Sequence, residues 1–118
     1  MEIFKQLKKL GYKHYIDLTI KELDKLPIDN IERRIECSLV IDWFREKHLI
    51  EILILPQNQS ACDPTPLYFI AIESYKNETF LELFNSTNDN DLLHYHLYYE
   101  AREQAILKAI ELIKGKNQ

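Results

Sequence analysis

The stretch that most constrains the fold of this chain is residues 29–55. Residues 30–47 have the pattern of a helix and contain the only tryptophan, Trp43, whose ring we expect to be buried. Residues 49–55 follow after a short charged corner, and six of these seven residues are aliphatic. A short, nearly continuous apolar run of this kind is typical of a strand covered by other elements. We therefore expect the hydrophobic core to form on this helix and strand.

Capping signals mark where the helices begin. Thr19 and Glu22 have the spacing of a capping box, in which each side chain binds the backbone amide of the other residue. Asp29 and Glu32 repeat this spacing, so we expect Asp29 to cap the central helix. A short amphipathic helix over residues 2–10 is predicted before both of them.

The apolar residues of the central helix are spread over more than one stripe. At about 100° per residue, one side is lined by Ile28, Ile31, Ile35 and Leu39. A second group fans round the helix from there and comprises Cys37, Val40, Ile41 and Phe44. We expect only a narrow sector to face solvent, that of Arg34, Ser38 and Arg45. An apolar face this broad indicates a helix that packs on a sheet and also touches another helix.

Two further strands and a helix are predicted after this central unit. A proline-containing loop over residues 56–66 leads to a strand at 67–74, and a short turn leads to a third strand at 79–84, which favours an antiparallel meander. Residues 99–114 have clear helical periodicity, with Gly115 placed to end the helix.

Residues 92–98 are ambiguous, because they alternate as a strand does and also continue the helical stripe. We favour a helix that begins near Asp91 or within the following turn. The sequence thus predicts one compact α+β domain over residues 1–118. Its small antiparallel sheet of about three strands should pack against a central helix and a C-terminal helix.

Composition argues against several classes of function. Only two glycines are present, so a glycine-rich phosphate-binding loop is not expected. The net charge of −4 argues against a dedicated nucleic-acid binder, because neutralised phosphates supply most of the affinity of such proteins. Two cysteines, no signal peptide and no apolar run long enough to cross a bilayer predict a cytoplasmic protein without membrane contact.

Histidines are the candidates for chemistry. His94 and His96 would point to one side of a strand and could bind a transition metal with Cys62 or Asp63, whereas on a helix they diverge. His48 has glutamates nearby and could act as a general base, but no nucleophile accompanies it. The plainer interpretation makes all three histidines polar side chains. We therefore expect no catalytic residue, no metal site and no cofactor.

Tyrosine is more frequent in this chain than a small hydrophobic core requires. The chain has seven tyrosines, and Tyr95, Tyr98 and Tyr99 form a cluster with Arg102 nearby. Tyrosine and arginine are favoured in protein interfaces. Stacking on single-stranded nucleic acid and simple core packing are the alternatives. Because few basic residues surround the cluster, we favour a protein surface over nucleic acid, and predict partner contacts at these four residues and at the loop over residues 56–66.

Three segments resemble a known group of proteins. They are Leu10-Gly11-Tyr12, the run Trp43-Phe44-Arg45-Glu46-Lys47-His48 before Ile50-Glu51-Ile52, and Tyr98-Tyr99-Glu100-Ala101 running into residues 109–113. In this order they are similar to small proteins of unknown function encoded by phages and prophages of Bacteroidota. Relatives often carry a glutamate where this chain has Tyr99.

The resemblance implies an accessory protein of a mobile element, and it supplies no active site. The function we expect is therefore a non-enzymatic protein that binds a host protein. The most specific version of this hypothesis is an anti-CRISPR inhibitor that docks on a host defence nuclease or on the RNA complex of that nuclease. Two alternatives stay open. One is a small metal-dependent enzyme, and the other is an RNA-binding module that uses the tyrosine cluster and the N-terminal lysines Lys5, Lys8, Lys9 and Lys13.

Overall fold

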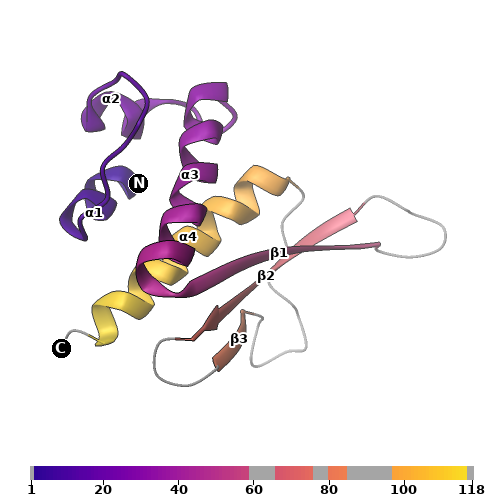
Figure 1. The fold of residues 1–118 in the computed structure, drawn as a ribbon. Helices are drawn as coiled ribbons and strands as arrows, with labels where there is room; N and C mark the ends of the chain where they lie inside the picture. The colour runs from indigo at the N-terminus through magenta and orange to yellow at the C-terminus, as the bar shows by residue number, and fades with distance from the viewer. Residues whose placement is uncertain (1, 59–65, 76–79, 85–96, 117–118) are drawn as a thin grey trace.

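The computed structural model describes residues 2–58, 66–75, 80–84 and 97–116 (Figure 1). Its architecture is α+β, with helices packed against an antiparallel sheet, as the sequence predicts. The elements in chain order are α1 (Ile3–Lys9), α2 (Ile20–Lys25), α3 (Ile31–His48), β1 (Ile50–Asn58), β2 (Pro66–Ser74), β3 (Phe80–Phe84) and α4 (Tyr98–Lys116). None of the helices described is long and apolar enough to cross a membrane.

Strands β1 and β2 form the longest pairing of the sheet. They are antiparallel over their whole length, with Asn58 opposite Pro66, and β3 lies on the other side of β2. β1 continues past its predicted end at Leu55, so the connection to β2 is shorter than the predicted loop over residues 56–66. Pro56 is tolerated because β1 lies at the edge of the sheet, where the missing N–H can face away from the ladder.

The core lies between the sheet and the two long helices. α4 contacts both β1 and β2, while α3 contacts β1 and α4, and Figure 1 shows α3 crossing α4 beside the strands. Alternate strand residues are buried in this core, namely Ile50, Ile52, Ile70 and Ile72. α4 buries three alanines at a spacing of four, Ala101, Ala105 and Ala109, together with Ile106, Ile110 and Ile113. Small side chains at this spacing let neighbouring backbones come close to the helix.

Polar contacts join α1 to α2, and the end of α2 to α3. The carboxylate of Asp24 accepts hydrogen bonds from the backbone amides of Phe4, at 2.8 Å, and Lys5, at 3.1 Å. Arg33 of α3 donates to the backbone carbonyls of Leu23, at 3.0 Å, and Leu26, at 3.1 Å. The first set satisfies amides in the first turn of α1 that have no partner within their own helix, and the second gives a charged donor to carbonyls at the end of α2.

Glu36 fixes the segment that joins α1 to α2. Its side chain is fully buried and accepts hydrogen bonds from the Tyr12 hydroxyl and from the backbone amides of Tyr15, at 3.1 Å, and Ile16, at 2.9 Å. Burial, and next the contact with Glu36, raises the pKa of Tyr12 far above its ordinary value. The hydroxyl therefore stays protonated and keeps donating to the carboxylate.

The faces of α3 differ from the prediction. Ile31 and Ile35 are 65% and 49% exposed, whereas Arg33 and Glu36 are buried, so the prediction that only Arg34, Ser38 and Arg45 face solvent is wrong. The physical reason is pairing, because a charge can be buried when a partner compensates it. Arg33 meets Glu103 of α4 at 2.7 Å. The buried side of α3 comprises Arg33, Glu36, Cys37, Val40 and Phe44.

The helix ends confirm one prediction and correct two. The capping box of Thr19 and Glu22 is present. The cap of α3 is Asn30 rather than Asp29, since the Asn30 side chain accepts from the Arg33 amide at 3.0 Å. Asparagine and aspartate cap helices equally well, so the residue types alone could not decide between Asp29 and Asn30. Gly115 lies inside α4 and does not end it.

Trp43 is half-buried rather than buried, because it lies at the margin of the core. Its ring packs edge-on against Tyr12, at 5.4 Å between centroids, and against Phe44, at 5.0 Å. Directly after this region, Leu49 ends α3 in a left-handed conformation with φ of 53°. The sharp corner between α3 and β1 thus depends on a backbone conformation that leucine adopts with strain.

Candidate docking surface

A shallow cavity of about 330 Å³ lies where the first half of α3 meets the start of α4. We call this region the α3–α4 surface and define it by the six residues that line the cavity, Ile31, Arg34, Ile35, Ser38, Tyr98 and Arg102. The four from α3 recur at intervals of three or four residues, and the two from α4 are four residues apart, so each set lies on one helical face. The surface is therefore carried by two helices and not by a loop.

Large apolar side chains are exposed on this surface. Ile31, Ile35 and Tyr98 are 65%, 49% and 44% exposed, and the neighbouring Leu97 is 45% exposed. A single exposed apolar residue is ordinary, but several around one cavity indicate a site that a partner covers.

The tyrosines of this region pack against arginines. The Arg34 guanidinium lies 4.9 Å from the centre of the Tyr99 ring, and the Arg102 guanidinium lies 5.5 Å from that of Tyr98. The Tyr98 ring also meets Tyr68 of β2 edge-on at 5.7 Å. These contacts hold the rings in fixed positions, so that a partner would meet a preorganised surface.

Arg102 is the unusual residue of the surface. It is only 7% exposed, and its Nη1 donates to Ser38 Oγ at 2.8 Å. Its Nε is buried and has no hydrogen-bond partner among the described residues. No carboxylate among the described residues forms an ion pair with Arg102, in contrast to Arg33, which is equally buried and paired with Glu103. The α3–α4 surface thus contains a buried positive charge that the described part of the chain does not neutralise.

The structure brings together three of the four predicted binding residues. Tyr98, Tyr99 and Arg102 lie at the start of α4, while Tyr95 lies outside the described residues, as does most of the predicted loop, residues 59–65. The sequence-based reasoning missed the contribution of α3. A sequence signal for this contribution exists, because Ile31 and Ile35 share helical spacing with Arg34 and Ser38, two polar residues that are predicted to face solvent.

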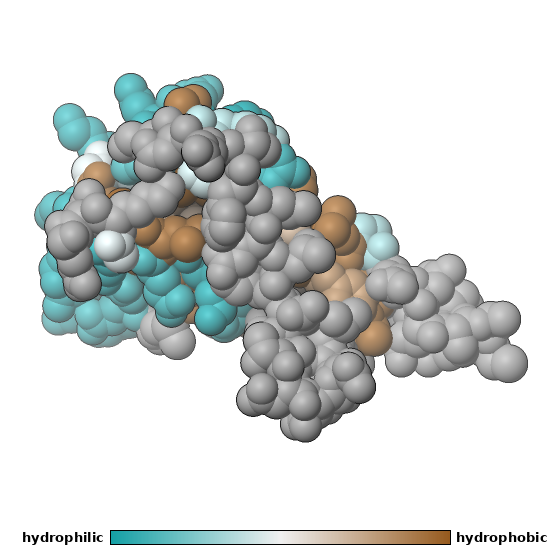
Figure 2. Space-filling view, turned by 90° about the horizontal axis from the view of Figure 1, so that it is seen from below, coloured by the Kyte–Doolittle hydropathy of each residue, from teal (hydrophilic) through white to brown (hydrophobic). Residues whose placement is uncertain are grey.

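A second surface, rich in lysine, lies on α1 and α2. A groove of about 600 Å³ is lined by Lys5, Lys8, Lys9, Lys21 and Lys25, together with Ile20, Glu2 and Asp24. We call it the lysine groove. Figure 2 shows the molecule from below, with hydrophilic side chains gathered at the left, the side on which both α1 and the C-terminal end of α4 lie in Figure 1. Residues 2–25 contain six lysines and four carboxylates, so this part carries +2 in a chain of net charge −4.

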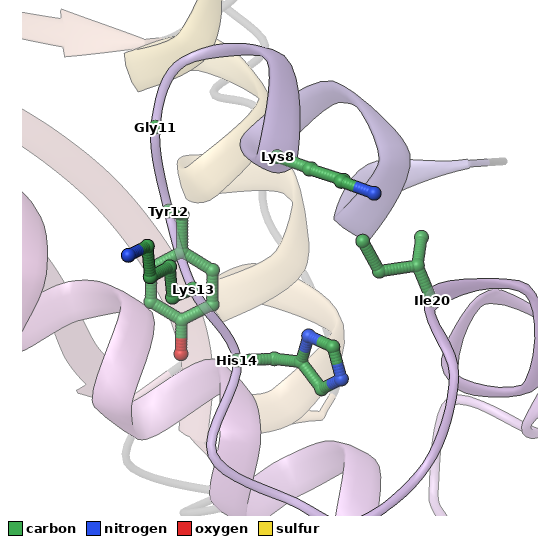
Figure 3. Close-up of a pocket in the computed structure, with 6 residues that line it drawn as sticks. All are labelled: Lys8, Gly11, Tyr12, Lys13, His14 and Ile20. Carbon is green, nitrogen blue, oxygen red and sulfur yellow. The ribbon is translucent and has the colours of Figure 1, made fainter.

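A smaller pocket of about 350 Å³ adjoins the lysine groove and shares Lys8 and Ile20 with it. Figure 3 shows the Lys8 amine and the His14 ring both directed toward the side of Ile20, whereas the Lys13 amine points away from them. His14 Nε2 lies 2.5 Å from the backbone carbonyl oxygen of Leu18, which fixes the ring. The imidazole is therefore engaged in holding the loop, and the pocket offers no pair of groups arranged for acid–base chemistry.

The residues suspected of chemistry have structural roles where they are described. His48 packs against the rings of Trp43, at 4.7 Å, and Phe44. The carboxylate of Glu51 is bound by Arg45 through two bonds of 2.8 and 2.7 Å, so it does not orient His48 as a base would require. His94, His96, Cys62 and Asp63 lie outside the described residues. Within the described ranges there is no group of three metal-binding side chains.

Cys37 is not an activated nucleophile. The side chain is buried and its sulfur lies 3.8 Å from Glu103 Oε2. Burial, followed by the negative charge of Glu103, raises the pKa of the Cys37 thiol to about 12. A thiol that stays protonated at neutral pH is a packing residue and not a reactive one.

When the chain is compared with protein-family models, with curated proteins and with solved structures, none of the three comparisons gives a match.

Proposed function

We propose that this chain is a non-enzymatic binding protein that docks on another protein through the α3–α4 surface. The observation that carries the proposal is one cavity lined by exposed Ile31, Ile35 and Tyr98 and by buried Arg102, which no carboxylate of the described residues neutralises. An apolar centre with tyrosine and arginine anchors is the composition of the energetically dominant part of a protein interface.

The geometry supports a protein partner better than a small molecule. The cavity is shallow and is formed by two helices, and its lining residues come from consecutive turns of each helix. A small-molecule site usually encloses most of its ligand, whereas a protein partner needs a firm, slightly hollowed patch of this kind. Tyr98 and Tyr99 are already held against arginines, which lowers the entropy lost on association.

The biological role that we propose is that of a mobile-element accessory protein acting on a host protein in the bacterial cytoplasm. Its sharpest form is inhibition of a host defence system such as CRISPR-Cas, by covering a surface of the defence nuclease or of its RNA complex. Support comes from the resemblance to phage and prophage proteins and from the compact α+β fold. Inhibition of this kind requires only a complementary surface and no chemistry.

The test is capture of a partner by the full chain from a lysate of a host bacterium. An Ile31→Asp/Ile35→Asp variant places two charges on the α3–α4 surface and should lose the captured protein, because both side chains are exposed and the fold does not need them. The matched control is Lys9→Asp/Lys25→Asp, which changes two exposed residues in the lysine groove. Retention by the control and loss by the first variant support the proposal. Equal capture by both variants contradicts it.

A second candidate function is supported by the lysine groove. Five lysines around one groove can attract the phosphates of RNA. In Figure 1 α1 and α2 lie on one side of α3 and the start of α4 lies on the other, so Tyr98 and Tyr99 do not extend this groove with stacking rings. If RNA is the partner, a gel shift should weaken with rising salt and should disappear in the Lys9→Asp/Lys25→Asp variant.

A further inference from the structure

We infer that Arg102 is the receptor for a carboxylate, so that the partner inserts an aspartate or glutamate side chain into the cavity of the α3–α4 surface. This inference rests on the proposed function and specifies the chemistry of the contact. It starts from the burial of Arg102, which is 7% exposed and has a buried Nε without a hydrogen-bond partner among the described residues. A buried guanidinium that lacks a counter-charge is costly, so a ligand that supplies one is favoured.

The free edge of Arg102 has the right geometry for a carboxylate. Its Nη1 donates to Ser38 Oγ, and its Nε is buried and has no hydrogen-bond partner among the described residues, so Arg102 must shift toward the cavity before a carboxylate can reach the edge formed by Nε and Nη2. The two N–H groups of that edge are parallel and match the two oxygens of a carboxylate.

Two other arginines of this protein bind a carboxylate through the same edge, formed by Nε and Nη2. Arg33 binds Glu103 through Nε, at 2.7 Å, and Nη2, at 2.8 Å. Arg45 binds Glu51 through Nε, at 2.8 Å, and Nη2, at 2.7 Å. In Arg102 the same edge carries no carboxylate from the described residues.

The surroundings favour a carboxylate on a protein over a phosphate on a nucleic acid. Ile31, Ile35 and Tyr98 line the same cavity as Arg102, and these apolar groups suit the hydrocarbon stem of an acidic residue and its neighbours. Arg34 at the rim is the other cation that lines the cavity, whereas a phosphate chain needs a row of cations. The cavity also lowers the local dielectric constant, which strengthens a single buried ion pair.

The first arm of the test separates a binding role of Arg102 from a structural one. In Arg102→Met a flexible apolar side chain replaces the buried charge, and Ser38 is exposed and can bond to water instead. We expect the melting temperature of this variant to be unchanged or higher. The matched control Arg33→Met removes an arginine that is buried and paired, and its melting temperature should fall by more than about 10 °C. A fall of similar size in Arg102→Met would show that the chain itself satisfies Arg102, and would overturn the inference.

The second arm uses sodium acetate as the probe and needs no partner. In the full-length protein the Nε–Hε NMR signal of Arg102 should shift saturably with acetate at ionic strength held constant with chloride, and the Arg34 signal should shift less. Inorganic phosphate is the parallel probe. Tighter binding of phosphate than of acetate, or an Arg102 signal that acetate leaves unchanged, would overturn the assignment to a carboxylate.

The third arm distinguishes this inference from the proposed function. If a captured partner binds the wild type and loses affinity in Ile31→Asp/Ile35→Asp, the surface is established whatever Arg102 does. Arg102→Met should then weaken the same complex by at least about tenfold, the usual effect of losing a hydrogen bond to a charged group. Unchanged affinity in Arg102→Met would refute the carboxylate contact and leave the docking surface intact. Acetate binding without any captured partner would support the anion site and refute the docking function.

Discussion

Breaking the buried ion pair between Arg33 and Glu103 should be among the most destabilising single changes on the helices. Arg33 Nε and Nη2 bind the two oxygens of Glu103, and both side chains are less than 10% exposed. Removing one member of such a pair leaves the other charged and buried, which costs about 3–5 kcal/mol. We expect losses of this size in the free energy of unfolding for Arg33→Met and for Glu103→Met.

The two single variants should not be equal. Without Glu103, Arg33 still donates to the carbonyls of Leu23, Asp24 and Leu26 at 3.0–3.3 Å. Without Arg33, the neighbour within reach of the Glu103 carboxylate is the weak donor Cys37, at 3.8 Å. Arg33→Met should therefore be the more damaging by about 1–2 kcal/mol, the cost of leaving those groups without their charged partners.

The double variant Arg33→Met/Glu103→Met separates pairing from packing. Neither charge is left alone in it, so it should recover at least about 2 kcal/mol relative to the sum of the single variants. Urea unfolding followed by the fluorescence of Trp43, the only tryptophan, measures all four proteins. Single-variant losses below about 1 kcal/mol, or purely additive losses, would refute the argument, because they would mean that water reaches the pair.

Three smaller predictions concern the region around the end of α3. Leu49→Gly should raise the free energy of unfolding by about 0.5–1 kcal/mol, because glycine adopts the left-handed conformation without strain; a loss measured by urea unfolding would contradict this. Trp43→Ala should cost about 2–3 kcal/mol, less than for a fully buried ring, and a cost above about 4 kcal/mol in a thermal melt would place the ring in the core. The hydrogen bond from Arg45 lowers the pKa of Glu51, so the ionised Glu51 contributes stability above its ordinary pKa of 4.5 and loses this contribution as pH falls through the lower pKa of the folded state. Urea midpoints measured as pH falls from above 4.5 through this lower pKa should therefore decrease less steeply in Glu51→Gln than in the wild type. Parallel curves for the two proteins would exclude the contribution.

The elements of the fold were predictable where the signal is local. The helix and strand around Trp43, the capping box at Thr19 and the strand before Ser74 each follow from residues a few positions apart. Periodicity and capping act within one or two turns, so a sequence alone carries enough information for them.

The polar core was not predictable by the same means. Arg33 and Glu103 are 70 residues apart in sequence, and nothing near either of them signals that the other will neutralise it. Because Arg33 and Glu36 take the buried side of α3, Ile31 and Ile35 turn outward. Long-range pairing of charges thus reversed the expected faces of the helix.

Only the α4 side of the candidate site could be predicted from the sequence, because the α3 side depends on contacts between segments far apart in the chain. Tyr98, Tyr99 and Arg102 were predicted to bind a partner because clustered tyrosine is a compositional signal. The α3 side of the surface depends on how two helices pack, which no short stretch encodes. That Arg102 is buried and lacks a carboxylate partner among the described residues is a property of the packed structure only.

The central claim is that a protein partner docks on the α3–α4 surface, and amide hydrogen exchange of the full chain with and without its partner tests it most directly. If the claim is right, binding slows exchange in residues 31–38 and 97–102 and leaves residues 2–25 around the lysine groove unchanged. Slower exchange confined to residues 2–25, with the start of α3 and of α4 unaffected, would contradict the account.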